Sequence, residues 1–389
     1  MDRSLVFQFK TPGMLPSSKV HSYPFGLAGR LGERIRREGP ITFCEWMRMA
    51  LYDEREGYYC RSDWRKWGRE GDYRTSPERS SLFAGTFARY FARLYEQLGS
   101  PREWTIVEVG AGDGRFASGV LETLQEWFPS VLSATRYVVD EAGSHSRSLA
   151  KERLEPFAGF QGRVEFARLA DVEVDPGIVF SNELLDAFPV HRVIKQEGEL
   201  REFYVGVNEG GSFEWLIGNP SKERLEQYFA GFGTQLSEGQ IVEVNPGIEE
   251  WLELVSRKIR TGYLVTVDYG AEAFDLYNAT ERRDGTLRAF HRHRLVADLL
   301  ANPGDCDITS TINWTLVKTL GTRNGFDVVA FDRQDRFLLD AGLLEEMELR
   351  VKETRRETDK LRLRTLAREM ILPGGMAESF QVLVQKKSD

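Results

Sequence analysis

The 389-residue sequence lacks any apolar stretch of the roughly 18 residues that a transmembrane helix requires. Residues 1–19 have no apolar core like that of a signal peptide. They also carry Asp2, so they do not match the Arg-rich, acid-free pattern of a transit peptide. We therefore expect a cytoplasmic protein that has no membrane partner.

Cysteine is scarce, and basic residues are not in excess. Cys44, Cys60 and Cys306 are scattered and form no CxxC pair, which argues against a disulfide scaffold and a zinc finger and favours a reducing compartment. Acidic residues outnumber basic ones, 60 to 52, and give a net charge of −8. Such a balance offers no electrostatic reason to expect a nucleic-acid partner. The sequence does not indicate an oligomeric state.

The sequence does contain an alternation of short apolar strands with helices. Repeated βαβ units with apolar strand interiors predict an α/β fold with a mostly parallel, doubly wound sheet covered by helices on both faces. Thr42 and Glu45 predict a capping box at the start of a helix before this region. We expect a helical and loop lead-in at 1–80 and a main domain at 81–389. Within the main domain we expect a helix at 81–98, strands at 104–109, 137–140, 164–166, 178–180, 263–268 and 380–384, an inserted α+β segment at 191–259 and a long charged helix at 343–372.

The strongest motif is a glycine loop, Glu108-Val109-Gly110-Ala111-Gly112-Asp113-Gly114, which follows an apolar strand and opens a helix. Its spacing is GxGxG, whereas a dinucleotide pyrophosphate on a helix N-terminus is typical of GxGxxG. Glycines allow the backbone to approach a ribose and an amino-acid moiety, and a carboxylate suits a nearby amino group and sulfonium. We interpret Glu108, Gly110, Gly112 and Gly114 as contacts to S-adenosyl-L-methionine. A strand–turn–helix without any ligand is the simpler alternative.

The next strand ends in two acids, Asp140 and Glu141, where the ribose hydroxyls of such a cofactor are expected. One carboxylate can accept hydrogen bonds from both hydroxyls. We assign this role to Glu141, with Asp140 as the second choice. The alternative is that both acids only complement the dipole of the following helix.

A third motif runs from Ile178 to Pro189 and places Asn182 and Glu183 at a strand end, where parallel sheets bind ligands. Glu183 and Asp186 are three residues apart, so one face of a helical turn can carry both. Paired carboxylates there can hold a cationic acceptor such as a guanidinium or an amine. We expect Asn182 to contact the cofactor and Glu183 and Asp186 to be catalytic. The alternative is that Asn182 and Asp186 only cap a turn.

Together these motifs resemble the MidA family of S-adenosylmethionine-dependent methyltransferases, found in bacteria and, as complex I assembly factors, in mitochondria. The resemblance extends from about Arg37 to Gln385. Besides the motifs above it is carried by several further segments: Gly39-Pro40-Ile41-Thr42 with Tyr52, Gly57-Tyr58-Tyr59, residues 71–78 with Leu82-Phe83, Asp268-Tyr269-Gly270, Gly285-Thr286-Leu287-Arg288 and Asp307-Ile308-Thr309. The segment 60–70, with Trp64 and Trp67, is longer than usual for the family.

The resemblance implies a Rossmann-like class I methyltransferase fold with S-adenosyl-L-methionine as cofactor and Ser76 as a further cofactor contact. Mitochondrial members of the family are linked to symmetric methylation of an arginine on a complex I subunit. The resemblance therefore implies a protein partner as substrate and an arginine as acceptor. Glu183 is then the first candidate to clamp the guanidinium and Asp186 the second, with Asp268 or Tyr269 in support.

Other functions are compatible with parts of this pattern. An NAD-dependent oxidoreductase shares a glycine loop followed by a strand-end acid, although it predicts a GxGxxG spacing. A methyltransferase fold can also act as an assembly factor that binds the cofactor without turnover. A metal site near His291 and His293, with Asp305, Cys306 and Asp307 behind them, lacks a tight ligand set, so we expect no metal.

Overall fold

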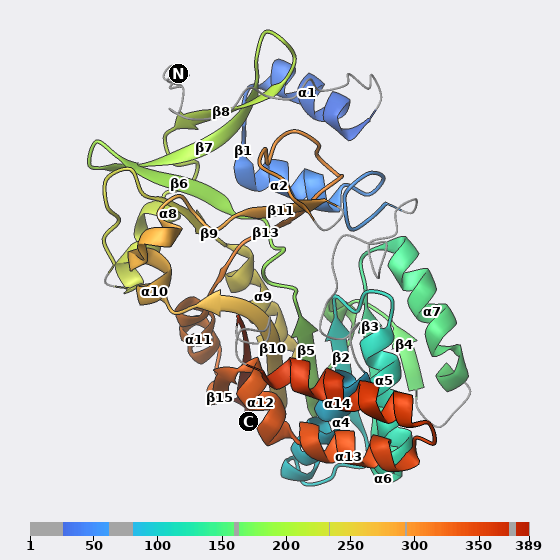
Figure 1. Ribbon diagram of the computed structural model, residues 1–389. Helices are drawn as coiled ribbons and strands as arrows, with labels where there is room; N and C mark the ends of the chain where they lie inside the picture. The colour runs from blue at the N-terminus through green and yellow to red at the C-terminus, as the bar shows by residue number, and fades with distance from the viewer. Residues whose placement is uncertain are drawn as a thin grey trace.

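The computed structural model describes residues 26–61, 81–158, 163–232, 234–291, 294–372 and 379–388. A large sheet with most of the helices occupies the lower part of Figure 1, and a smaller antiparallel sheet lies above it. None of the helices in these residues combines the length and the apolar character that a membrane span needs.

Five parallel strands form the centre and one edge of the large sheet. They lie in the order β4 (Arg163–Phe166), β3 (Thr135–Asp140), β2 (Trp104–Val109), β5 (Gly177–Asn182) and β10 (Gly262–Ala271). Beyond β10, β16 (Phe380–Lys387) and β15 (Asp327–Arg333) continue it antiparallel, and the short β14 (Ile312–Asn313) pairs with the end of β10. This arrangement confirms the predicted mostly parallel, doubly wound α/β fold.

Helices cover both faces of the large sheet, which explains why its strands are apolar throughout. One face packs against α4 (Ser81–Gln97), α5 (Arg115–Trp127), α6 (Pro129–Ala134) and α7 (Ser144–Ala158). There the rings of Phe116 and Phe180 stack with centroids 4.3 Å apart. The other face packs against α9 (Gly247–Lys258) and α11 (Trp314–Arg323). The helix α9 lies within the segment 191–259 that we expected to be an insertion, yet its buried side chains join the core of the large sheet.

The lead-in and the inserted strands share one upper layer (Figure 1). In this layer β6 (His191–Gln196), β7 (Glu199–Val207), β8 (Phe213–Gly218) and β9 (Ile241–Val244) pair antiparallel. From the lead-in, β1 (Ile41–Thr42) adds to β7, while α1 (Leu27–Glu38) and α2 (Phe43–Tyr52) bury apolar side chains in the same layer. The side chain of Thr42 accepts a hydrogen bond from the Glu45 amide at 3.2 Å, so Thr42 caps α2 as predicted.

Smaller elements connect the two layers. A third sheet is formed by β11 (Arg288–His291), β12 (Arg294–Leu295) and β13 (Asp307–Thr309). The remaining short helices described are α8 (Arg224–Gln227), α10 (Ala273–Asn278) and the 3₁₀ turns Leu169–Asp171, Tyr228–Phe232 and Thr280–Arg282.

The prediction of a single charged helix at 343–372 is wrong. After α12 (Gln334–Ala341), the chain forms α13 (Leu343–Glu353) and α14 (Glu357–Ile371), with extended backbone at Thr354 (φ −75°, ψ 124°) between them. The break lets Ala367 and Met370 of α14 reach the same core as Leu343 of α13. An uninterrupted helix would leave the apolar residues of its second half without that core to pack on.

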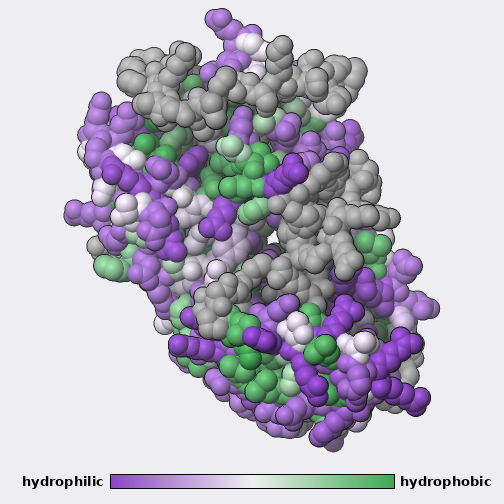
Figure 2. All heavy atoms as spheres, viewed as in Figure 1, coloured by the Kyte–Doolittle hydropathy of each residue, from purple (hydrophilic) through white to green (hydrophobic). Residues whose placement is uncertain are grey.

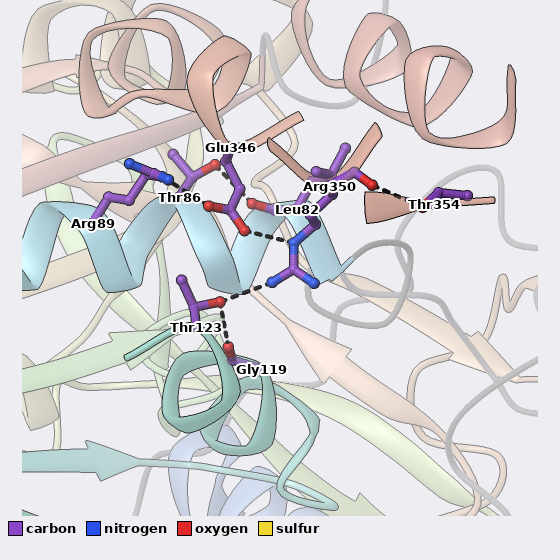
Figure 3. Close-up of polar contacts among 8 residues, drawn as sticks. All are labelled: Leu82, Thr86, Arg89, Gly119, Thr123, Glu346, Arg350 and Thr354. Atoms are coloured by element: carbon purple, nitrogen blue, oxygen red, sulfur yellow. Dashed lines mark hydrogen bonds and ion pairs between the residues drawn. The ribbon is translucent and has the colours of Figure 1, made fainter. Parts of the chain in front are cut away.

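A buried carboxylate joins α13 to α4. Glu346 is fully buried, and its carboxylate accepts hydrogen bonds from Arg89 Nε at 2.7 Å and Arg350 Nε at 2.5 Å (Figure 3). Arg350 also donates to Thr123 Oγ1 at 2.8 Å, which links the network to α5. Gly85 leaves the necessary space, because a Cβ there would lie 2.3 Å from Glu346 Oε1. Charge, in addition to apolar packing, therefore sets the position of α13.

Candidate active site

A cavity of about 230 Å³ opens at the carboxyl ends of the central parallel strands. This is the edge at which open parallel sheets bind their ligands. The structure brings six of the predicted site residues to its wall: Glu108, Gly110, Gly112, Glu141, Asn182 and Glu183. Ser76, Trp64, Trp67 and His293 lie outside the described residues.

The glycine loop between β2 and α5 has backbone geometry that only glycine adopts readily. Gly110, Gly112 and Gly114 have φ values of +73°, +56° and +77°. Gly110 is also close to the next strand end, since a Cβ there would lie 3.1 Å from Leu184 Cδ1. A Cβ on Gly114 would lie 3.0 Å from the Cβ of Ala150 in α7. Gly110 and Gly112 thus leave the cavity wall bare, and Gly114 allows α5 to pack against α7.

The carboxylate of Glu141 is held on the cavity wall by two backbone amides. Gly112 donates to its Oε2 at 2.9 Å and Gly143 donates to its Oε1 at 2.7 Å. These two bonds orient the carboxylate, and a carboxylate oxygen can accept more than one hydrogen bond, as contacts to two ribose hydroxyls require. Asp140 was the second choice for this role. Its Oδ2 already accepts a hydrogen bond from the amide of Leu169 at 2.7 Å. The geometry therefore favours Glu141 over Asp140.

Glu108 is a buried acid at the end of β2. Its Oε2 accepts a hydrogen bond from the hydroxyl of Tyr137 at 2.7 Å, and the residue is 4% exposed. Burial raises the pKa of Glu108 to about 8; the Tyr137 hydrogen bond lowers it, and the neighbouring Glu141 and Asp113 raise it further. A positive group placed in the cavity would favour the charged form of Glu108. This carboxyl therefore fits the cationic amino-acid end of the expected cofactor.

The end of β5 presents an acceptor atom and a carboxylate. Asn182 Nδ2 donates to Glu183 Oε1 at 3.0 Å, while Asn182 Oδ1 is buried and has no hydrogen-bond partner among the described residues. A buried acceptor without a partner is costly unless a ligand supplies a donor. Glu183 has a left-handed backbone (φ +53°), which is uncommon outside glycine and often found at functional sites. Asn182 Oδ1 thus fits a donor such as an amino group.

Asp186 does not share the cavity wall with Glu183, because it is buried in the turn that follows. The amides of Leu185 and Asp186 donate to Asp268 Oδ2 at 3.0 and 3.3 Å, which ties this turn to the end of β10. Burial raises the pKa of Asp186 to about 6, and a hydrogen bond from the Tyr269 hydroxyl acts in the opposite direction. Burial and the nearby charge of Asp186 raise the pKa of Asp268 well above its usual value.

Two tyrosines of the lead-in, to which the sequence assigned no role, also line the cavity. The hydroxyl of Tyr52 donates to the carbonyl of Ala187 at 3.1 Å, and that of Tyr59 donates to Asp307 Oδ1 at 2.5 Å. Their rings stack with centroids 5.5 Å apart. The only sequence signal for them was their place in the family motifs. Among the described residues, no group of three His, Cys, Asp or Glu side chains is placed to hold a metal ion.

Comparison with known proteins points to one family. Residues 86–331 match the family model described as "Putative S-adenosyl-L-methionine-dependent methyltransferase". The mitochondrial protein arginine methyltransferase NDUFAF7 homolog of Drosophila melanogaster is 28% identical over 346 residues, which cover 81% of this chain and 76% of that protein. The human mitochondrial NDUFAF7 is 26% identical over 310 residues, covering 74% and 67%.

A solved structure shares the fold over almost the whole chain. It is a Burkholderia thailandensis protein bound to S-adenosyl-homocysteine, with a TM-score of 0.82, 28% identity and coverage of 93% of this chain and 92% of that one. The expectation of a cytoplasmic protein is contradicted by the named relatives from fly and human, which are mitochondrial.

Proposed function

Since the chain belongs to the S-adenosyl-L-methionine-dependent methyltransferase family identified by that match, with S-adenosylmethionine as its cofactor, we propose that it methylates an arginine side chain of a protein. The family excludes the NAD-dependent oxidoreductase considered from the sequence. The names of the fly and human relatives, which are protein arginine methyltransferases, support an arginine acceptor. The observation that carries the proposal is the carboxylate of Glu183 on the wall of the cofactor cavity.

The described residues fit this cofactor. When bound, S-adenosylmethionine supplies a methyl group on a sulfonium and leaves as a neutral thioether. In our proposal Glu141 accepts hydrogen bonds from the ribose hydroxyls, and Asn182 Oδ1 accepts one from the amino group. Gly110 and Gly112 let the backbone approach closely, and Glu108 offers negative charge to the positive groups. Positioning is the main contribution of the protein to such a transfer.

The acceptor needs a carboxylate because a guanidinium is protonated and its nitrogen lone pairs are delocalised. In our proposal Glu183 binds two N–H groups of the guanidinium and draws its positive charge away from the attacking nitrogen. As the new N–CH₃ bond forms and the S–CH₃ bond breaks, that nitrogen releases one proton to the carboxylate of Glu183. Asp186, which is buried three residues further along the chain, remains the second candidate for this proton.

Exchange of Glu183 for glutamine tests the proposal, because the two side chains have the same shape. S-adenosylhomocysteine binding is measured by isothermal titration, and labelled methyl transfer into a cell lysate is followed by mass spectrometry of the modified residues. We expect unchanged binding and methyl-arginine formation slower by about 100-fold or more. The matched control is Glu199→Gln on the exposed start of β7, which should leave both unchanged.

Three results would contradict the proposal. Unchanged turnover in Glu183→Gln removes Glu183 from the mechanism. Methylation by the wild-type protein on a residue other than arginine refutes the acceptor. Binding of S-adenosylhomocysteine without any methyl transfer by the wild-type protein would support an assembly factor that does not turn over.

A further inference from the structure

The segment after β5 carries Glu183 and also connects the two layers of the molecule. Residues 183–190 lead from the end of β5 in the large sheet to β6 in the upper layer (Figure 1). Glu183, Leu184 and Ala187 line the cofactor cavity. We call residues 183–187 the Glu183 turn. Because Glu183 has a left-handed backbone, this conformation persists only where surrounding contacts fix it.

Contacts from distant parts of the chain hold the backbone of the Glu183 turn. Four hydrogen bonds join it to β10, to α2 and to the loops before α9 and after β13. They run from the Glu183 amide to the Val267 carbonyl (2.9 Å), from Asn245 Nδ2 to the Leu185 carbonyl (3.2 Å), from the Ser310 amide to the Asp186 carbonyl (2.9 Å) and from the Tyr52 hydroxyl to the Ala187 carbonyl (3.1 Å). The conformation of the turn is therefore set by the whole fold and not by its own sequence.

Asp268 at the end of β10 binds the middle of the Glu183 turn. Hydrophilic side chains cover most of the coloured surface in Figure 2, whereas Asp268 is 0% exposed. Its Oδ2 accepts hydrogen bonds from the amides of Leu185 at 3.0 Å and Asp186 at 3.3 Å, and its Oδ1 accepts one from the Tyr269 amide at 2.9 Å. Buried polar groups need such partners. The carboxyl group of Asp268 thus binds backbone amides, and it does not line the cofactor cavity.

Loss of the Asp268 side chain would leave the amides of Leu185 and Asp186 without an acceptor. A buried N–H group without an acceptor is costly, so the turn would move until water or another group reached these amides. Glu183 lies only two residues before Leu185, and such a movement would displace its carboxylate. A displacement of about 1 Å in a positioned group can slow a reaction about 100-fold.

We propose that Asp268 is the positioning residue for Glu183. It contacts neither the cofactor nor the acceptor, and it acts on methyl transfer by holding the backbone of the Glu183 turn. This role differs from direct support of a guanidinium clamp, which the family resemblance implied for Asp268. The expected effect on the reaction rests on the proposed function, whereas the expected effect on the turn does not.

The test compares two exchanges of Asp268 with the same exchanges of another buried aspartate. Asp268→Ala removes the acceptor, whereas Asp268→Asn keeps one oxygen that can accept hydrogen bonds from both amides. The matched controls are Asp335→Ala and Asp335→Asn. Asp335 lies near the start of α12, is 8% exposed and accepts hydrogen bonds from Arg333 at 2.7 and 3.1 Å. Isothermal titration with S-adenosylhomocysteine shows first that each variant is folded.

Amide hydrogen exchange of residues 182–188, followed by mass spectrometry, measures whether the Glu183 turn has loosened. We expect exchange at least about tenfold faster in Asp268→Ala than in the wild type, because two amides lose their acceptor. Asp268→Asn and both Asp335 variants should exchange here at nearly the wild-type rate. Unchanged exchange in Asp268→Ala would overturn the inference.

Methyl transfer is measured with a synthetic peptide that carries the arginine methylated in the cell lysate. We expect Asp268→Ala to lower kcat about 100-fold and Asp268→Asn about tenfold or less. KM for the peptide and the affinity for S-adenosylhomocysteine should change less than about threefold. In a protein that already carries Glu183→Gln, Asp268→Ala should lower kcat little further, because the group that Asp268 positions is already lost.

Three kinetic results would overturn the inference. They are an undiminished effect of Asp268→Ala in the Glu183→Gln protein, an equal loss of kcat in Asp335→Ala, and a loss in Asp268→Asn as large as in Asp268→Ala. Absence of arginine methylation by the wild-type protein would instead refute the proposed function. Hydrogen exchange at residues 182–188 would then still decide whether Asp268 holds the turn.

Discussion

Exchange of Glu346 for glutamine removes one negative charge from the network that joins α13 to α4, without changing the shape of the side chain. The carboxylate forms ion pairs with the guanidinium groups of Arg89 and Arg350. Both arginine side chains are only 17% exposed. A glutamine can accept a hydrogen bond from one of them and turns its amide group toward the other. Removal of one partner from a buried ionic network typically costs about 3–5 kcal/mol.

That cost can be converted into a melting temperature. Unfolding entropy is about 2.1 cal/mol/K per residue, so a cooperative unit of 389 residues has roughly 0.8 kcal/mol/K. A loss of about 3–5 kcal/mol then lowers Tm by roughly 4–6 °C. Circular dichroism during heating measures this shift, and urea unfolding measures the free energy independently.

The control is Glu357→Gln in α14. Glu357 pairs with Lys360 at 2.7 Å but its side chain is 80% exposed, so its loss should change Tm by less than about 1 °C. If the Tm of Glu346→Gln also differs from that of the wild type by less than about 1 °C, the ion pairs contribute nothing measurable to stability. Apolar packing alone would then hold α13 in place. That outcome would refute our reasoning about the network.

Three further predictions concern the cofactor cavity. Glu141→Gln should weaken S-adenosylhomocysteine binding in calorimetry by about 10- to 100-fold, because charge-assisted hydrogen bonds are lost, whereas Asp140→Asn should have a much smaller effect. Gly110→Ala should cost about 1–2 kcal/mol of stability in urea unfolding, since its φ is +73°, and should also weaken binding because the new Cβ meets Leu184. The pKa of Glu108 is raised to about 8 by burial, so between about pH 5 and pH 8 the folded state holds a proton that the unfolded state releases. Stability should therefore fall as pH rises through this window, and Glu108→Gln should flatten the fall in urea unfolding measured at several pH values; an equal slope in both proteins would contradict the raised pKa.

Much of the fold follows from local patterns in the sequence. The strand around Ile178 and Val179 is predictable because its side chains are buried on both faces of a parallel sheet and therefore read as one apolar run. The glycine loop is predictable because positive φ values at Gly110 and Gly112 leave few other residue types. In these segments, the residues that determine the structure are near one another along the chain.

Other parts depend on distant contacts or on backbone geometry that no spacing rule contains. Tyr59 reaches the cavity because its hydroxyl bonds Asp307, 248 residues away in sequence. Glu183 and Asp186 were expected on one helical face, but the left-handed backbone of Glu183 breaks that turn and leaves Asp186 buried with Asp268. The break at Thr354 likewise follows from packing on α4 and not from a local helix breaker.

The position of β16 has a consequence for how the protein is made. This strand is bonded on both sides, to β10 and to β15, yet it follows every other described strand along the chain. While the ribosome is still translating residues 380–387, the nascent chain must carry β10 with an open edge and apolar side chains exposed. Open edges of that kind favour aggregation and chaperone binding. The central sheet can close only after residues 380–387 have been made.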